Sequence, residues 1–520
     1  MKRFALISVS DKTGIDALAG ELHKAGFEII STGGTAKFLA AKGLPIIQIT
    51  DWTGFPEIMD GRVKTLHPKV HGGILADLDI PEHVSIMQEL GINPIEVVVV
   101  NLYPFEQTVA NPASTEEDII ENIDIGGPTL IRSAAKNFRH VVVLTEEQDY
   151  SEAIAQLQES GKTTLELRKR LAHRAFAHVE RYDKTISRYF AKVLRKPLKE
   201  SDEEAVAILD EIDICAPIVQ TMRYGENPHQ KAGYFSTTTE GWTQLHGKPL
   251  SYNNLLDLDA ALKGIVLFEK PTAMIFKHTN PCGIGSGDNL LEAYQKAFET
   301  DPLSPFGGII AVNQTLDLVT VSKINEIFSE IIIAPAFETD AMEILKKRKD
   351  RRLVVFDRDK VIAERPDFEV KSIVSGYLVQ DWDKTIALED GWKIVTHRQP
   401  DSDEYEALRF AWKTVSILKS NAIALTSKDQ TLGLGIGQTS RIDSTEIAIN
   451  KAIRFGHDLS SSVCASDGFF PFRDSVELLS RHGIKAVIQP GGSKGDEDVI
   501  AACNELGISM IFTGMRHFRH

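Results

Sequence analysis

Short, nearly continuous apolar runs alternate with stretches of helical spacing in the first part of the chain. The runs are Phe4 to Val9, Phe27 to Ile30, Ile46 to Ile49, Val97 to Val100 and Val141 to Leu144. After the first run, apolar residues recur at helical spacing through Leu18 and Leu22 until Gly26. Apolar strands separated by helices are typical of a parallel sheet with both faces covered. The pattern therefore predicts an α/β domain whose ligands lie at the carboxyl ends of its strands.

Polar loops follow the first two apolar runs. Ser10-Asp11-Lys12-Thr13-Gly14 and Ser31-Thr32-Gly33-Gly34-Thr35 each supply hydroxyl and backbone N–H groups at the start of a helix. Such a loop suits a phosphate, but each one alone is equally typical of an ordinary helix N-cap. Two of them at the same edge of one sheet favour a phosphate site.

A basic loop comes next, from Gly61 to Pro68, and it holds Arg62, Lys64 and His67. One interpretation is a solvated loop that keeps its cations in water. Beside two phosphate-type loops in an acidic protein, a substrate site is the better interpretation.

Two more polar segments end a strand or open a helix in this part of the chain. Asn101 and Tyr103 follow an apolar run and share one face of the predicted strand, because side chains alternate across it. Asp124 opens a helix that carries Arg132 and Lys136, four residues apart and therefore on one side. Candidate chemistry thus gathers where the strands end and the helices begin.

In the second part of the chain, an apolar run from Thr272 to Phe276 ends in Lys277 and His278. A strand end places side chains at the mouth of a sheet, and the following Asn-Pro and Gly-x-Gly stop the strand and free backbone N–H groups. Lysine next to histidine offers a proton donor beside a base that titrates near neutral pH. A histidine near an apolar run is more often structural, so the pair alone leaves both interpretations open. A helix is predicted before this strand, from Leu256 to Glu269.

An internal repeat organises the rest of the second part. Each copy has a Gly-Ile-Gly turn, at 283–285 and again at 435–437, followed by the same alternation of helices and apolar strands. The duplication predicts two similar α/β layers, divided near residues 370–400, with a ligand cleft between or beside them. The charged stretch Lys196 to Glu204 is the predicted linker, which gives a first domain of residues 1–198 and a second region of residues 199–520.

Composition narrows the classes of function. Lys and Arg total 58 against 73 Asp and Glu, a formal net charge of -15, which opposes a general affinity for nucleic acid or an anionic membrane. The four cysteines form no C-x-x-C pair, so reduced thiols are expected instead of a zinc ribbon or a disulfide framework. The first apolar run is too short for a signal sequence, and no apolar run has the length of a membrane span. We therefore expect a soluble, cytoplasmic protein.

The segments SDKTG, STGGT, GRVKTLHP, NLYPF and IDIGGPTLIRSAAKN stand in this order in the first part, and RYGENPHQ, KHTNPCG, FFPFRD and a terminal R-x-F stand in the second. Together they resemble the AICAR transformylase/IMP cyclohydrolase family of bifunctional purine-biosynthesis proteins. The resemblance implies a methylglyoxal-synthase-like α/β domain followed by two duplicated cytidine-deaminase-like α/β domains. Pro281-Cys282 lacks the second cysteine and the H-x-E that zinc deaminases use, so no metal is expected to take part.

The resemblance also implies two reactions in a homodimer. 10-Formyltetrahydrofolate donates a formyl group to the 5-amine of AICAR, and formyl-AICAR then closes to IMP with loss of water. The residues implied in catalysis of ring closure are Lys64, Tyr103, Asp124 and Lys136. Those implied in binding its substrate are Ser10, Asp11, Lys12, Thr32, Gly33, Gly34, Thr35, Arg62, Val63, Thr65, Asn101 and Ile125.

For formyl transfer, His278 is expected to accept the proton of the AICAR amine. Lys277 is expected to stabilise the developing oxyanion or to protonate the departing folate nitrogen. The substrate contacts implied by the resemblance are Arg223, Tyr224, Gly307, Glu330, Asn421, Arg441, Phe469, Asp474, Ser493, Arg516 and Phe518. The arginines among them are suited to bidentate binding of phosphate and carboxylate groups.

Two alternatives compete with this interpretation. A nucleic-acid-binding module would need a basic face with interleaved aromatic residues, which the acidic balance disfavours. A single-function phosphate lyase built on the first domain alone would leave the KHTNPCG and FFPFRD segments unexplained.

Overall fold

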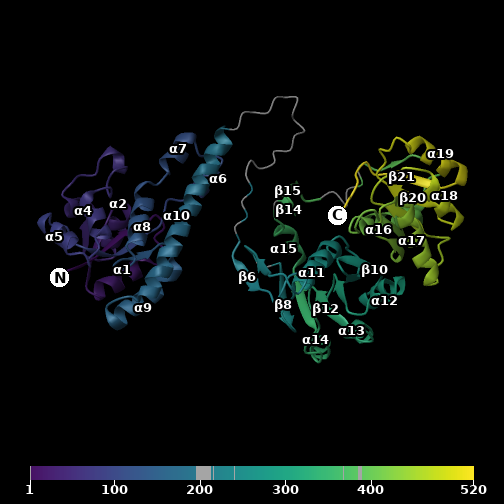
Figure 1. Ribbon diagram of the computed structural model, residues 1–520, viewed down its shortest axis with the longest axis horizontal. Helices are drawn as coiled ribbons and strands as arrows, with labels where there is room; N and C mark the ends of the chain where they lie inside the picture. Colours follow the sequence, from purple (N-terminus) through teal and green to yellow (C-terminus); the bar gives the residue numbers. More distant parts are fainter. Residues whose placement is uncertain are drawn as a thin grey trace. The chain divides into compact units, whose positions relative to one another are not determined.

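The computed structural model describes residues 2–194, 212, 214, 216–238, 241–366, 368–383, 389 and 391–520. The chain divides into two compact units, residues 1–205 and 206–520 (Figure 1). The predicted linker, Lys196 to Glu204, lies outside the described residues, so the boundary at residue 198 stays a prediction. Among the helices described, none has both the length and the apolar character needed to span a bilayer.

The first unit is built on a five-stranded sheet with the order β3-β2-β1-β4-β5. Its strands are β1 (Arg3–Ser8), β2 (Phe27–Ser31), β3 (Ile46–Gln48), β4 (Ile95–Val100) and β5 (Val142–Leu144), and all neighbours are parallel. The four strands β1, β2, β4 and β5 are buried along most of their length. The predicted parallel α/β fold is therefore confirmed, and it brings the loops after β1, β2 and β4 to one edge of the sheet.

Helices cover both faces of this sheet. The long helix α10 packs against α8 and β5 (Figure 1) and contributes Leu167, Leu171 and Val179 to a core that it shares with the strands. The helices are α1 (Ile15–Lys24), α2 (Gly33–Ala41), α3 (Ile49–Thr53), α4 (Pro68–Leu75), α5 (Pro81–Glu89), α6 (Phe105–Ala110), α7 (Glu116–Glu121), α8 (Gly126–Lys136), α9 (Tyr150–Ser160) and α10 (Leu165–Leu194).

The second unit contains two six-stranded sheets with the same strand order and the same strand directions. The first sheet has the order β10-β9-β11-β12-β13-β8, and the second, read from its other end, β18-β17-β19-β20-β21-β16. In the first sheet, β12 is parallel to both of its neighbours, β11 and β13, and in the second sheet β20 is parallel to both β19 and β21. The other neighbouring strands in each of these two sheets are antiparallel. The predicted duplication is confirmed.

The first sheet consists of β8 (Trp242–His246), β9 (Thr272–Lys277), β10 (Asn280–Ser286), β11 (Gly308–Val312), β12 (Ser329–Ala334) and β13 (Arg352–Phe356). The second consists of β16 (Lys393–Ile394), β17 (Ile423–Thr426), β18 (Thr431–Gly435), β19 (Val463–Ser466), β20 (Ala486–Gln489) and β21 (Ser509–Phe512). Between the copies lies the hairpin of β14 (Phe368–Ile373) and β15 (Gly376–Asp381), and β6 (Ile218–Thr221) and β7 (Gly233–Phe235) form a separate pair.

The helices of the two copies also correspond. The matching pairs are α11 (Tyr252–Ile265) with α16 (Ser402–Val415), α12 (Leu290–Thr300) with α17 (Arg441–Arg454), α13 (Leu318–Ile324) with α18 (Asp474–Arg481), and α14 (Thr339–Lys346) with α19 (Asp496–Leu506), while α15 (Arg358–Ala363) follows β13. One core cluster joins Phe276 and Ile309 of the first copy to Phe410 and Leu434 of the second, so the copies fold around shared apolar side chains. The predicted start of α11 at Leu256 is wrong, because Ser251 and Asn254 form a capping box that begins the helix at Tyr252.

The predicted Gly-Ile-Gly turn of the first copy is also wrong, whereas in the second copy Gly435 ends β18 and Gly437, with a φ of 70°, lies in the bend that follows. Gly283 and Gly285 lie inside β10, where a Cβ atom would stand 2.0 Å from the Ala297 carbonyl oxygen and 2.3 Å from the Ala293 carbonyl oxygen of α12. Gly433 and Gly435 have the same position in β18, with a Cβ atom 2.0 Å and 1.8 Å from carbonyl oxygens of α17. These glycines let a helix lie directly on an edge strand. The equivalent pair in the second copy therefore starts two residues earlier than the sequence repeat suggested.

Candidate active sites

The two predicted phosphate-type loops of the first unit meet Asn101 at the carboxyl ends of β1, β2 and β4. Asn101 Oδ1 accepts hydrogen bonds from the backbone N–H groups of Ser10 (2.5 Å) and Asp11 (3.1 Å). Thr35 Oγ1 accepts from Val9 N–H at 3.1 Å and donates to the Val9 carbonyl oxygen at 2.8 Å. The structure thus brings the Ser10 loop, the Thr32–Thr35 loop and Asn101 together.

Neither loop uses its side chains to cap the helix that follows. The residues before α1 and α2, Gly14 and Thr32, make no side-chain hydrogen bond to the first turn. Thr32 Oγ1 lies instead 2.9 Å from Ser8 Oγ, between β1 and β2. The N-cap interpretation is therefore wrong, and the N–H groups of the first turn of α2 remain without a side-chain cap, as an anion site requires.

Asp124 lies at the start of α8 in a half-buried setting. Its Oδ1 accepts from Gly127 N–H at 2.8 Å, and its backbone N–H donates to Tyr182 Oη at 2.7 Å. Burial raises the pKa of the Asp124 carboxyl, while the Gly127 hydrogen bond and the charge of Lys64 oppose the rise. The Asp124 carboxyl and the Lys64 ammonium are therefore electrostatic neighbours, with a proton held more tightly than in an exposed aspartate.

Tyr182, on α10, was not among the predicted residues. Besides the hydrogen bond from Asp124, its hydroxyl donates to the Asn122 carbonyl oxygen at 3.1 Å. Burial, with Asp124 and Tyr103 nearby, raises its pKa to about 12. No local motif marks Tyr182, because it meets Asp124 only through the packing of α10 on the rest of the unit.

The remaining predicted residues of the loop 61–68 have diverse surroundings. Arg62 is ion-paired with Glu121 and is largely exposed. Val63 pairs with Ile58 in an isolated bridge, and Thr65 Oγ1 lies close to Gly126, where a Cβ atom would stand 2.9 Å away. Outside this loop, the Lys12 ammonium, in the loop after β1, donates to the Ser10 carbonyl oxygen at 3.2 Å. The Ile125 side chain, directly before α8, is exposed.

Lys136 is the predicted catalytic residue that the fold separates from the others. Lys136 is the last residue of α8 and Gly126 is the first. Because an α-helix rises by about 1.5 Å per residue, the backbones of Gly126 and Lys136 are about 15 Å apart. Lys136 lines a pocket between α8 and α10 with Arg132, Lys169 and His173. Within the described part of the chain, no carboxylate forms an ion pair with any of these four side chains, so the pocket is strongly cationic.

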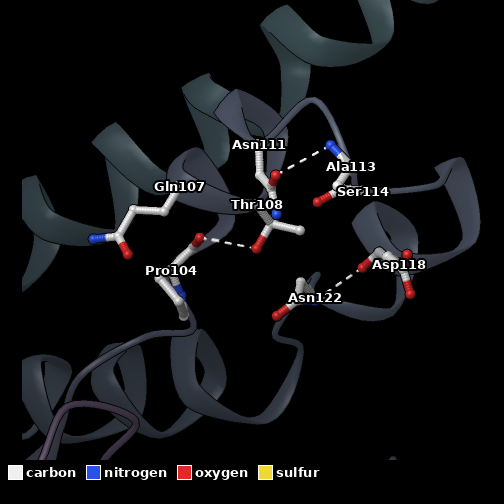
Figure 2. Close-up of a pocket in the computed structure, with 8 residues that line it drawn as sticks. All are labelled: Pro104, Gln107, Thr108, Asn111, Ala113, Ser114, Asp118 and Asn122. Carbon is white, nitrogen blue, oxygen red and sulfur yellow. Dashed lines mark hydrogen bonds between the residues drawn. The ribbon is translucent and has the colours of Figure 1, made fainter.

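A second hollow of the first unit holds none of the predicted residues. Figure 2 shows it between Pro104 and Asn122, where the polar groups bond to one another: Thr108 Oγ1 donates to the Pro104 carbonyl oxygen, and Asn122 Nδ2 donates to the Asp118 carbonyl oxygen. These are hydrogen bonds of the ends of α6 and α7. Asp77, Asp79 and His140 also approach one another, but His140 Nε2 already forms a hydrogen bond of 3.0 Å with an Asp77 carboxylate oxygen.

In the second unit, Lys277 ends β9, and His278 and Thr279 form a two-residue turn to β10. The φ angles of His278 and Thr279 are 54° and 64°, which is the geometry of a type I′ hairpin turn. The Lys277 ammonium donates to the carbonyl oxygens of Phe306 (3.0 Å) and Ser304 (3.4 Å). The predicted strand end is confirmed, and it presents an ammonium beside an imidazole.

Gly307 and Glu330 lie near this strand end. Gly307 has a φ of 74°, donates its N–H to the Phe328 carbonyl oxygen at 2.8 Å, and precedes β11, the neighbour of β9. Glu330 is the second residue of β12 and forms an ion pair with Arg352 at 2.7 Å. Asn280 links the turn to the second copy, because its Oδ1 accepts from Lys419 N–H at 3.4 Å.

Asn421, Arg441 and Phe518 meet around Asp467, a residue outside the predicted set. The Arg441 guanidinium pairs with the fully buried Asp467 carboxylate and donates to Asn421 Oδ1 at 2.9 Å. A Cβ atom at Gly468 would stand 2.6 Å from both Arg441 Nη2 and the Phe518 ring. Arg441 is therefore already engaged within the protein, and it holds Asn421 in place.

The other predicted transformylase residues lie on several loops. The Arg223 guanidinium lies 5.8 Å from the Tyr224 ring centre, and Arg516 lies 4.6 Å from that of Phe518. Phe469 is exposed, Asp474 accepts from the N–H of Ser475 at 2.6 Å, and Ser493 Oγ accepts from Gly495 N–H at 3.0 Å. Within the described part of the chain, no hydrogen bond or ion pair joins these residues to Lys277 or His278.

These features define an α/β enzyme with one group of polar side chains at a parallel sheet edge and another on a duplicated fold. In comparison with known proteins, an MGS-like domain matches residues 14–129, and the AICARFT/IMPCHase bienzyme family matches residues 134–451, a range that begins within the first unit and continues into the second. The chain belongs to the AICARFT/IMPCHase bienzyme family.

Full-length relatives agree with that assignment. The bifunctional purine biosynthesis proteins PurH of Bacillus mycoides and Persephonella marina are 48% and 47% identical over 526 and 528 residues, which is 100% of this chain and 100% of each relative. The crystal structure of ForH matches 37% of this chain and 100% of that chain at 35% identity, with a TM-score of 0.34. The chain is accordingly a bifunctional enzyme of the last two steps of IMP synthesis, with AICAR formyltransferase and IMP cyclohydrolase activities and a folate-derived formyl donor.

Proposed function

We propose that the two reactions take place at separate sites, formyl transfer at the turn after β9 and ring closure at the first unit's sheet edge. The observation that carries the first assignment is the adjacent ammonium and imidazole of Lys277 and His278, held at a strand end. The AICAR amine attacks the formyl carbon of 10-formyltetrahydrofolate, and His278 accepts the amine proton. The bond from the formyl carbon to the folate nitrogen then breaks, and Lys277 supplies a proton to that nitrogen.

For ring closure, we propose that the phosphate lies between the Ser10 loop and the start of α2, where the N–H groups have no side-chain cap. The carboxamide nitrogen attacks the formyl carbon, and the formyl oxygen leaves as water after proton transfer. Asp124, with its raised pKa, exchanges protons with the reacting groups, while Lys64 and Tyr103 stabilise the oxyanion. Lys136 stays in the proposal because of the family resemblance alone. Within one chain it lies at the opposite end of α8 from Asp124.

We further propose a cytoplasmic homodimer that needs no metal for either step. Exposed apolar side chains gather on the hairpin β14–β15 between the two copies, which supports an interface there. The residues are Val370, Ile373, Val374, Tyr377 and Leu378. Analytical ultracentrifugation of the whole protein tests the dimer.

Rates measured with supplied substrates test the two-site assignment. Purified protein given AICAR and 10-formyltetrahydrofolate should release tetrahydrofolate and form IMP, and protein given formyl-AICAR alone should form IMP. His278→Ala should lower only the rate of tetrahydrofolate release, and Asp124→Asn only the rate of IMP formation from supplied formyl-AICAR. A variant that lowered both rates equally would contradict separate sites.

A further inference from the structure

The turn that carries His278 is a conformation that its residues rarely adopt. Type I′ turns need positive φ at both central positions and are dominated by glycine, asparagine and aspartate. This turn has histidine at a φ of 54° and threonine at 64° instead. A β-branched residue at positive φ is an outlier, and such a residue persists only where its surroundings hold it. The structure must therefore contain groups that hold the turn.

Asp257 supplies that support. Its Oδ1 accepts a hydrogen bond from Thr279 N–H at 2.5 Å, and the backbone N–H of His278 lies close enough to the same carboxyl group to lower its pKa. One carboxylate thus faces the backbone of the turn. Burial raises the pKa of Asp257, while these N–H groups and the charge of His278 oppose the rise.

The position of Asp257 is itself fixed. It lies on the second turn of α11, whose start is set by the capping box of Ser251 and Asn254. The neighbouring Leu258 and Ala261 are buried in the core that contains Phe276 of β9. The helix and the strand therefore cannot slide past each other without opening that core.

We propose that Asp257 is a positioning residue for formyl transfer, which holds the strained His278–Thr279 turn so that the imidazole stays at the end of β9. This inference rests on the proposed role of His278 as the base. An alternative is that the carboxylate only satisfies the backbone donor of Thr279 and that His278 keeps its place without it. The two hypotheses predict different rates of formyl transfer when a second substitution removes the strain of the turn.

The test compares Asp257→Ala with Asp259→Ala, which removes an exposed carboxylate of the same helix that forms an ion pair with Lys263 at 2.7 Å. Asp257→Ala should lower kcat for formyl transfer by about 10–10²-fold, the cost of a small misplacement of a catalytic group, with KM for AICAR changed less. Asp259→Ala should stay within about twofold of the wild type. Cyclisation of supplied formyl-AICAR, measured on the same samples, should be unchanged in both and shows that the protein is folded.

Rescue separates positioning from a general structural role. Glycine adopts positive φ without strain, so adding Thr279→Gly to Asp257→Ala should raise kcat for formyl transfer again. On a logarithmic scale, the double variant should recover at least about a third of the decrease in kcat that Asp257→Ala causes. Failure of the rescue in protein that still cyclises formyl-AICAR would overturn the proposal, as would a wild-type kcat in Asp257→Ala. His278→Ala distinguishes the two hypotheses. If His278→Ala and Asp257→Ala both transfer the formyl group at the wild-type rate, the proposed role of His278 has failed. If His278→Ala is impaired and Asp257→Ala is not, only the positioning role of Asp257 has failed.

Discussion

The Arg441 guanidinium and the Asp467 carboxylate form a buried ion pair that fixes the side chain of Asn421 beside the C-terminal segment. Asp467 also accepts from the backbone N–H of Ala422 at 3.0 Å and from the Ser420 hydroxyl at 2.5 Å. One carboxylate thus joins β17, α17 and the loop after β19. The pair organises the loops on which the predicted substrate contacts of the second copy lie.

Removal of Asp467 should therefore destabilise the second unit. Asp467→Ala leaves the Arg441 charge buried without a partner, which typically costs about 3–5 kcal/mol of unfolding free energy. Lys323→Ala, which removes an exposed pair with Glu326, should cost less than about 1 kcal/mol. Urea unfolding followed by tryptophan fluorescence measures both, since Trp242, Trp382, Trp392 and Trp412 all belong to this unit. Equal losses in the two variants would contradict the role given to the buried pair.

His278→Ala should lower formyl transfer by about 10²–10⁴-fold, the usual contribution of a general base. Lys277→Met should also lower it, through lost stabilisation of the oxyanion or leaving group. External base at high pH should restore part of the rate of the histidine variant but not of the lysine variant. A formyl-transfer rate in His278→Ala equal to that of the wild type, with AICAR saturating, would make the histidine a structural residue.

The raised pKa of Asp124 predicts a pH dependence of stability. The folded unit binds this proton more tightly than the unfolded chain does, so the contribution of Asp124 is complete below its ordinary value of 3.8 and is lost as pH rises through the higher folded value. Asp124→Asn keeps the acceptor for Gly127 and does not titrate. The wild type should thus lose stability relative to Asp124→Asn as pH rises from about 4 to 8 in urea unfolding experiments. A difference that stays constant with pH would show that burial does not penalise the charge.

Lys136→Ala should abolish cyclisation and leave formyl transfer within about twofold, because effects at distant sites are additive. Lys169→Ala is the matched control, since it removes another cation from the same pocket. Initial rates with supplied formyl-AICAR compare the two. Equal losses would assign the effect to the charge of the pocket, and a parallel loss of formyl transfer would contradict separate sites.

Residues 1–198 should fold alone and retain cyclisation of supplied formyl-AICAR. Among the described residues, those that form the buried core of the first unit, from Phe4 to Tyr182, all belong to that unit. Limited proteolysis between Lys196 and Glu204 should release the fragment, and circular dichroism and the cyclisation rate test it. An insoluble or inactive fragment would contradict this boundary.

The elements that the sequence predicted best are those with a local pattern. Phe4 to Ile7 and Ala273 to Phe276 are apolar without interruption, so their strands could be predicted from their own residues. Asp257, Tyr182 and Asp467 could not be identified as parts of the sites, because each acts on a segment far away in the chain: Thr279, Asp124 and Arg441. Such contacts depend on how helices pack, which periodicity does not specify.

The errors have the same origin. Gly283 and Gly285 looked like a turn because glycine commonly ends a strand, yet the close approach of α12 is what requires them. Lys136 and Asp124 belong to one sequence motif, but helix α8 separates their backbones within one chain, so the role of Lys136 in cyclisation stays a prediction.

The two copies of the duplicated fold use equivalent hairpins differently. The first hairpin, β9–β10, ends in the half-buried Lys277 and the exposed His278, whereas the tip of the second, between β17 and β18, bonds to the first copy. Asp429 accepts there from Ser286 N–H at 2.7 Å and pairs with Lys296, and Gln430 donates to the Lys296 carbonyl oxygen at 3.0 Å. Divergence after duplication thus left one tip open to solvent and made the other a tie between the copies, so the two tips tolerate different substitutions.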